Sequence, residues 1–182
     1  MKYLVPCLAL VLLATPAMGQ SVGEKTGINS TLGISPATED FAKQAAISDM
    51  FEIQSSKLAE ERGNAAEKSF AANMIKDHEK TTSDLKSMVS GGELKVTLPT
   101  ELDSSHQSKI DKLKSLKGAD FSSRYDSDQL SGHKDAVSLF ERYAKGGDHP
   151  KLKEWADKML PTLRHHLEMA QDLSSGKTVG KH

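Results

Sequence analysis

The chain has 182 residues, of which 37% are hydrophobic and 27% are charged, and its formal net charge is −1. This length and composition predict one globular domain with its own core. The two signs of charge are balanced and form no blocks, which disfavours nucleic acid and anionic membranes as partners.

The first 19 residues have the pattern of a secretory signal peptide. Lys2 gives a positive start, residues 4–13 are almost wholly apolar, and Ala17 and Gly19 are the small residues that signal peptidase selects. The apolar run is shorter than the roughly 20 residues that a spanning helix needs. The alternative, a buried N-terminal helix, is disfavoured because the run has no amphipathic face. We predict cleavage after Gly19 and a mature protein in the periplasm or cell envelope.

The single cysteine, Cys7, lies inside the predicted signal peptide. The mature chain would then have no thiol, so it would form no disulfide and offer a metal ion no sulfur ligand. A bound ion would be held by nitrogen and oxygen atoms. The mature sequence also has no apolar segment long enough to span a membrane.

Four long helices and one short helix are predicted after a Gly-, Ser- and Thr-rich leader (residues 20–34) that we expect to be flexible. Ser35 and Pro36 are suited to the start of the first helix. Asn64 and Glu67 have the spacing of a capping box at the start of the second. The predicted helices span residues 35–62, 64–90, 103–116, 120–145 and 148–174, and a tail predicted to be disordered spans 175–182.

These elements predict an all-α fold, because no segment alternates long enough for a strand. Residues 35–174 would form a ferritin-like four-helix bundle, with the short helix in the long connection between the second and third bundle helices. That connection, residues 91–117, either crosses the length of the bundle, as in ferritin-like folds, or turns back.

One polar residue on each long helix shares a face with apolar residues. His78, His133 and His166 lie at helical spacing among apolar neighbours, and Glu52 lies on a narrower apolar face of the first helix. A helix rises about 1.5 Å per residue, which places Glu52 and His78 about 16 and 21 Å from the connection at Gly63. His133 and His166 lie about 21 and 27 Å from the connection at Gly147. Three imidazoles and a carboxylate would therefore meet near mid-bundle.

Two interpretations of this set remain open. Imidazole nitrogen and carboxylate oxygen suit a divalent transition metal, which would be zinc, iron, manganese or copper. The same residues would also form a hydrogen-bonded network that fixes the helix register without a metal. In either case a buried Glu52 needs a cation or a hydrogen-bonded partner, because an unpaired buried carboxylate is costly.

Other polar residues are weaker candidates. Asp77 is one residue off the apolar face of its helix, so we expect its carboxylate in solvent, and His165 falls on a polar face. Pro161 lies within the last helix and should curve it, since proline removes a backbone hydrogen bond. No Ser–His–Asp grouping, phosphate-binding loop or zinc-protease motif occurs.

The order and spacing of these segments resemble the bacterial family called domain of unknown function 4142. The resemblance covers about residues 38–174 and rests on Phe41–Ala46 with Glu52 and Leu58-Ala59, Phe70-Ala71-x-x-Met74-Ile75-x-Asp77-His78, Gly118-Ala119-x-Phe121 with Tyr125 and His133, and Leu160-Pro161-x-Leu163-x-x-His166-Leu167.

The resemblance implies a ferritin-like bundle, an exported protein and the label of outer membrane protein, but no settled activity. Di-iron ferritins place a Glu three residues before a His on each of two helices. Here Ile75 precedes His78 and Leu163 precedes His166 at that spacing. A ferroxidase or iron-storage role therefore does not carry over.

Three functional classes follow from the sequence. The first is a non-enzymatic periplasmic bundle that binds a metal or serves in envelope stress. The second is a mononuclear metalloenzyme that acts on oxygen or a small oxidant. The third is a structural or partner-binding bundle whose His and Glu residues belong only to the core. Metal content separates the third class from the other two, and turnover separates the second from the first.

Overall fold

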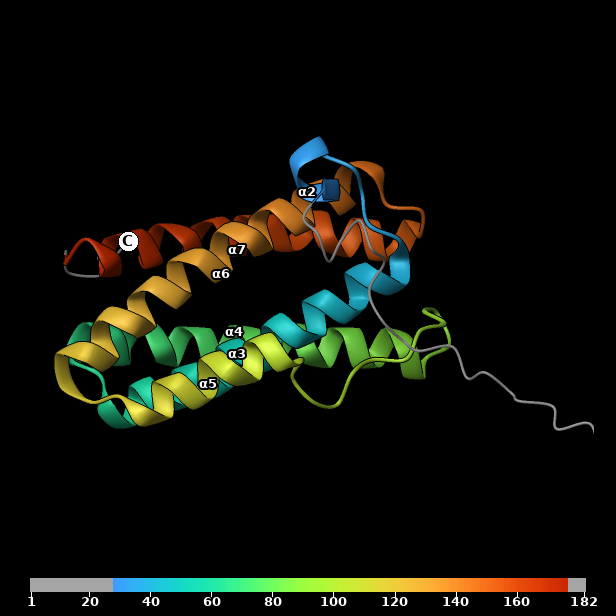
Figure 1. Cartoon of the computed structure of the whole chain (residues 1–182). Helices are drawn as coiled ribbons and strands as arrows, with labels where there is room; N and C mark the ends of the chain where they lie inside the picture. The colour runs from blue at the N-terminus through green and yellow to red at the C-terminus, as the bar shows by residue number, and fades with distance from the viewer. Residues whose placement is uncertain (1–27, 177–182) are drawn as a thin grey trace, which may run out of the picture.

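The computed structural model describes residues 28–176, and every regular element in that part of the chain is an α-helix. The prediction of an all-α chain is confirmed for these residues. Four long helices form a bundle (Figure 1): α3 (Thr38–Arg62), α4 (Ala65–Ser90), α6 (Gly118–Gly146) and α7 (Pro150–Ser174). Two shorter helices accompany them: α2 (Ile28–Leu32) and α5 (Ser104–Ser115).

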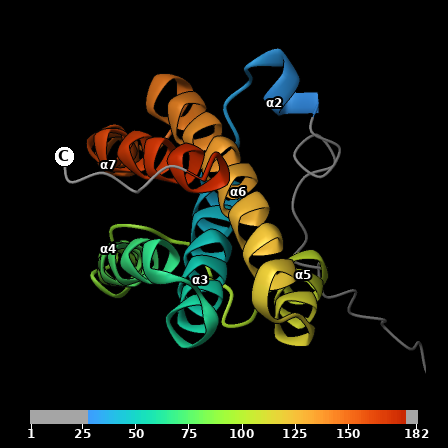
Figure 2. The same ribbon diagram turned by 90° about the vertical axis from the view of Figure 1, so that its left-hand side faces the viewer.

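The long helices pair as two antiparallel hairpins. α3 and α4 form the first, and α6 and α7 form the second (Figures 1 and 2). Each helix packs most extensively on its hairpin partner, while α3 against α6 and α4 against α7 join the two hairpins more sparsely. The middle of the bundle is therefore lined by one face from each of four helices.

The connection from α4 to α6 crosses the length of the bundle, which resolves the alternative that the sequence left open. Its start lies beside the α6–α7 turn, where the Nε2 atom of His149 lies 2.8 Å from the carbonyl oxygen of Glu93. Its end lies beside the α3–α4 turn, where Nη1 of Arg62 donates to the carbonyl of Lys114 at 2.9 Å. α6 consequently starts at the same end of the bundle as α4 (Figure 1).

Local sequence explains where two of the long helices begin. The predicted capping box of α4 is present: the Asn64 side chain accepts from the backbone N–H of Glu67, and the Glu67 carboxylate accepts from the backbone N–H of Asn64. α7 begins at Pro150 after the cap residue His149, as expected from the fixed φ of proline.

The predicted starts of two helices are wrong by two or three residues. The hydroxyl of Ser35 donates to the carbonyl of Pro36 instead of capping, and α3 begins only at Thr38. α6 begins at Gly118 rather than residue 120. The chain enters the helix there from the extended Lys117, and Gly118 has a positive φ of 54°, which glycine adopts without strain.

The two ends of the sequence are only partly described. The composition of residues 20–34 predicts a flexible leader, but part of it, Ile28–Leu32, forms α2, and Nη1 of Arg142 donates to the carbonyl of Ile34 at 2.6 Å. Residues 175 and 176 form a turn after α7. The predicted signal peptide and the remainder of the leader and tail lie outside the described residues. None of the described helices has a stretch long and apolar enough to cross a membrane.

The core has two apolar ends and a polar middle. The cluster near the α6–α7 turn includes Phe41, Leu85 and Tyr143. The cluster near the α3–α4 turn includes Phe70 and Phe121. Each large side chain buried in these clusters contributes about 1.5–3 kcal/mol. Between the two clusters, the four helices bury a layer of polar side chains: Asp49, Glu52, Ser55, His78, Gln129, His133 and His166.

Candidate metal centre

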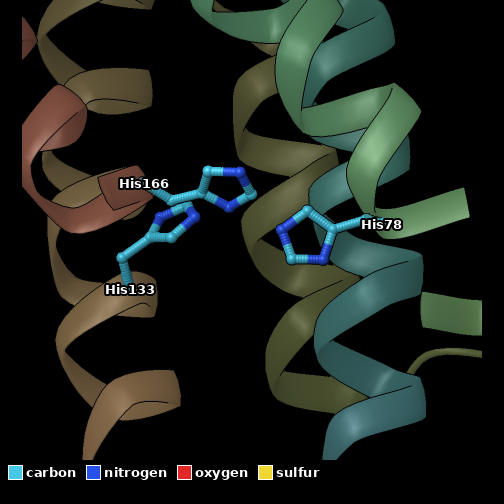
Figure 3. A group of neighbouring side chains, drawn as sticks. All are labelled: His78, His133 and His166. Atoms are coloured by element: carbon cyan, nitrogen blue, oxygen red, sulfur yellow. The ribbon is translucent and has the colours of Figure 1, made fainter. Parts of the chain in front are cut away.

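Three histidines from three helices converge in the polar middle layer. His78 comes from α4, His133 from α6 and His166 from α7, and their rings face a common space (Figure 3). One nitrogen of each ring lies within 4.8 Å of one nitrogen of each of the other two. All three residues are at most 4% exposed. We refer to them as the histidine triad.

Each ring is oriented by a partner on its outer side. Nδ1 of His78 lies 2.8 Å from Oδ1 of Asp49, and Nδ1 of His133 lies 2.9 Å from the carbonyl oxygen of Gln129. Nε2 of His166 lies 3.0 Å from Oδ2 of Asp77. A neutral imidazole with one N–H donated to such an acceptor keeps its other nitrogen as a lone-pair donor.

The remaining nitrogen of each ring has no hydrogen-bond partner among the described residues. These atoms are Nε2 of His78, Nε2 of His133 and Nδ1 of His166. A network without metal would pair such buried atoms directly at about 2.7–3.2 Å, because an unsatisfied buried polar atom costs about 1–3 kcal/mol. The triad has the outer contacts of a network but lacks the inner ones.

The electrostatic environment favours neutral rings at His133 and His166. Burial, together with nearby His78 and His166, lowers the pKa of His133 to about 3. Burial and His78 lower the pKa of His166 to about 4. Burial also opposes the charged form of His78, but the hydrogen bond and negative charge of Asp49 outweigh it and raise the pKa of that ring. Neutral imidazole is the form that ligates metal ions.

Glu52 lies in the same layer but outside the triad. It is only 2% exposed, and its Oε2 has no hydrogen-bond partner among the described residues. The set of ligand atoms within 4.8 Å of one another does not include this carboxylate. Burial raises the pKa of Glu52 to about 7, although the charge of His78 and a hydrogen bond from Gln129 act in the opposite direction.

The absence of a side chain at Gly132 leaves room for the Glu52 carboxylate beside α6. Gly132 lies inside α6, and a Cβ at that position would be 3.2 Å from Oε1 of Glu52. A glycine within a helix costs about 1 kcal/mol relative to alanine. The close approach of this carboxylate to the backbone of α6, one residue before His133, gives that glycine a structural reason.

The four residues predicted from helical spacing divide into a group of three and one neighbour. His78, His133 and His166 are brought together, and Glu52 is buried in the same layer. His165 points away and is half exposed, with its Nδ1 atom 4.0 Å from the Glu168 carboxylate.

The residues that orient the rings are not evident from helical periodicity. The expectation that Asp77 lies free in solvent is wrong, because its partner His166 comes from another helix, α7. Asp49 lies one turn before Glu52 on α3, and that spacing was the available signal for it. Nothing in the sequence reveals the role of Gln129, because its backbone carbonyl is the acceptor.

A family model described as Domain of unknown function (DUF4142) matches residues 23–173, which is most of the chain. No curated protein and no solved structure matches the chain. The chemistry of the site must therefore be argued from its own residues.

Proposed function

The chain belongs to the DUF4142 family, whose description assigns no activity, and we propose that it is an exported protein that binds a divalent transition metal ion through His78, His133 and His166. The observation that carries this proposal is the difference between the two nitrogens of each ring. The outer nitrogen is held by a carboxylate or carbonyl, and the inner nitrogen has no partner. Metal-ligating histidines almost always have such an outer partner.

The charge around the triad supports a cation. Asp49 and Asp77 contact its rings, and the buried Glu52 lies beside it. A divalent cation among three neutral rings would offset the cost of burying the carboxylates of Asp49 and Glu52. Three nitrogen donors favour zinc or copper over manganese, which prefers oxygen ligands. Ligation would draw the nitrogens to about 2.0–2.1 Å from one centre.

Metal content tests this proposal. Mature protein should hold about one equivalent of Zn²⁺ or Co²⁺ per chain after dialysis, measured by elemental analysis and by titration. His133→Phe should abolish this uptake. His165→Ala is the matched control, because it removes an exposed imidazole from the residue next to His166 and should retain full binding. Wild-type protein without retained metal, or equal retention by His133→Phe, would contradict the proposal.

Metal binding fits the site better than turnover does. A mononuclear enzyme would leave a fourth position for water or substrate, with Glu52 as the adjacent proton acceptor. A substrate would have to bind and turn over beside rings that are at most 4% exposed, whereas a metal ion has to pass the surrounding side chains only during exchange. The closed surroundings favour a binding role over a catalytic one.

Two features support the wider assignment. The four long helices and the full-length connection between α4 and α6 are consistent with a ferritin-like arrangement, which has one long crossover. Lys2, the apolar run and the Ala17-x-Gly19 pattern support export. Mass spectrometry of native protein should show an N-terminus at Gln20, and a protein that retains Met1 in the cytoplasm would contradict export.

A further inference from the structure

A buried metal centre needs a route to solvent, and the partners of the triad differ in whether they provide one. The Asp49 side chain is 7% exposed and Gln129 is fully buried. The Asp77 side chain is 35% exposed, while that of His166 is 3% exposed. Of the three groups that orient the rings, only Asp77 reaches both solvent and a ring of the triad.

Asp77 lies at a sparse interface of the bundle. It belongs to α4, and its hydrogen bond to His166 spans the seam between α4 and α7. These two helices belong to different hairpins and make far fewer contacts with each other than with their hairpin partners. Opening this seam disturbs less buried surface than separating the two helices of either hairpin would.

The backbone of α7 is also weakened close to this point. Pro161 lies inside α7, one turn and a residue before His166, and a proline has no N–H to donate to the carbonyl of Asp157. α7 therefore lacks one backbone hydrogen bond in the segment that carries His166. A small bend there would move the ring relative to α4 without unfolding the helix.

We propose that metal ions enter and leave the triad through the α4–α7 seam, with Asp77 as the residue that captures the ion and passes it to His166. This inference rests on the proposed metal-binding function. A carboxylate at the surface attracts a cation from solvent, and its contact with Nε2 brings that cation to the outer edge of the His166 ring. The other ring nitrogen, Nδ1, is the unpaired atom of the triad, so a movement of the ring at the opened seam would complete the transfer. Asp77 would act on the rate of exchange, whereas Asp49, which is buried, would act only on the stability of the bound state.

Stopped-flow kinetics with Co²⁺ separates these roles in full-length mature protein. Asp77→Asn should slow association about tenfold, because it removes the capturing charge. Asp49→Asn should leave association unchanged and speed dissociation, with an affinity loss of about 10- to 100-fold as expected for a lost ring partner. Asp77→Glu should restore most of the association rate.

Asp84→Asn is the matched control for surface charge. Asp84 lies two turns after Asp77 on the same helix with a side chain 31% exposed, but it pairs with Lys80 and Trp155 instead of the triad. It should bind Co²⁺ at the wild-type rate.

The outcomes distinguish the two proposals. A wild-type association rate in Asp77→Asn, or equal slowing in Asp84→Asn, overturns the proposed route and leaves metal binding intact. Absence of Co²⁺ uptake by the wild-type protein overturns both proposals. Circular dichroism of each variant should match the wild type, since the substituted carboxylates pack in neither apolar cluster.

Discussion

The ends and the middle of the bundle bury polar groups in different ways. At the α3–α4 turn, Glu67 is fully buried, and both of its carboxylate oxygens accept hydrogen bonds from Asn64. In the middle layer, Glu52 is buried just as deeply, but its Oε2 has no partner among the described residues. The hydrogen bonds of the buried Glu67 account for the start of α4. The unpaired oxygen of the buried Glu52 requires either a ligand or a strained core.

The same contrast extends to the whole of each region. The apolar ends hold large side chains in mutual contact, including Phe41 stacked on Tyr143 with ring centroids 4.0 Å apart. The middle places three imidazoles 5.6–6.0 Å apart, centroid to centroid, with their inner nitrogens unsatisfied. The ends should therefore supply stability in all conditions, and the middle should supply stability only when a metal is bound.

The largest expected effect comes from an apolar end. Phe70→Ala should lower the free energy of unfolding by about 3–5 kcal/mol, because Phe70 is fully buried and its removal leaves a cavity. The loss should be the same with Zn²⁺ and with chelator, measured by urea unfolding. A loss of unfolding free energy that appears only with Zn²⁺ would contradict the claim that the apolar ends are stable independently of metal.

The second effect belongs to the middle. At a free Zn²⁺ concentration one hundred times its dissociation constant, wild-type protein should gain about 2.7 kcal/mol over chelator-treated protein, and His133→Phe should gain nothing. In chelator, His133→Phe should be at least as stable as the wild type, because it removes an unsatisfied buried nitrogen. A large loss in chelator would show that His133 serves the core.

The third effect tests the satisfied polar group at the α3–α4 turn. Asn64→Ala removes the side-chain cap of α4 and should cost about 1 kcal/mol at any metal concentration. Thermal unfolding with and without chelator measures it. If Asn64 acts only as the cap of α4, the melting temperature falls by the same amount with and without chelator.

The smallest effect concerns Asp126, whose Oδ1 has no hydrogen-bond partner among the described residues and which follows Tyr125 of the apolar cluster near the α3–α4 turn. Burial and then the charge of Glu67 raise the pKa of Asp126 from 3.8 to about 7. Between those values the folded chain keeps a proton that the unfolded chain releases, so stability falls as the pH rises through this window. Asp126→Asn should flatten that slope in urea unfolding at pH 5 and pH 8, with a gain on the order of 1 kcal/mol or less at pH 8, because Asp126 is only partly buried and solvent screens its charge. An unchanged slope would show that the pH dependence of stability comes from other residues.

Sequence reasoning reached the features that depend on one helix at a time. Periodicity found His78, His133 and His166, because each shares a face with apolar residues of its own helix. It missed the role of Asp77, because that residue lies off its own apolar face and its partner is on α7. It also missed α2, since a helix of five residues has no period to detect. The start of α3 was misplaced because Ser35 bonds locally and does not cap.

X-ray absorption spectroscopy of the zinc-loaded mature protein tests the central claim most directly. The account predicts one zinc ion per chain with three imidazole nitrogens at about 2.0–2.1 Å, and loss of that spectrum in His133→Phe. A first shell made of oxygen ligands alone, or a spectrum unchanged in His133→Phe, would contradict the assignment of His78, His133 and His166 as a metal centre.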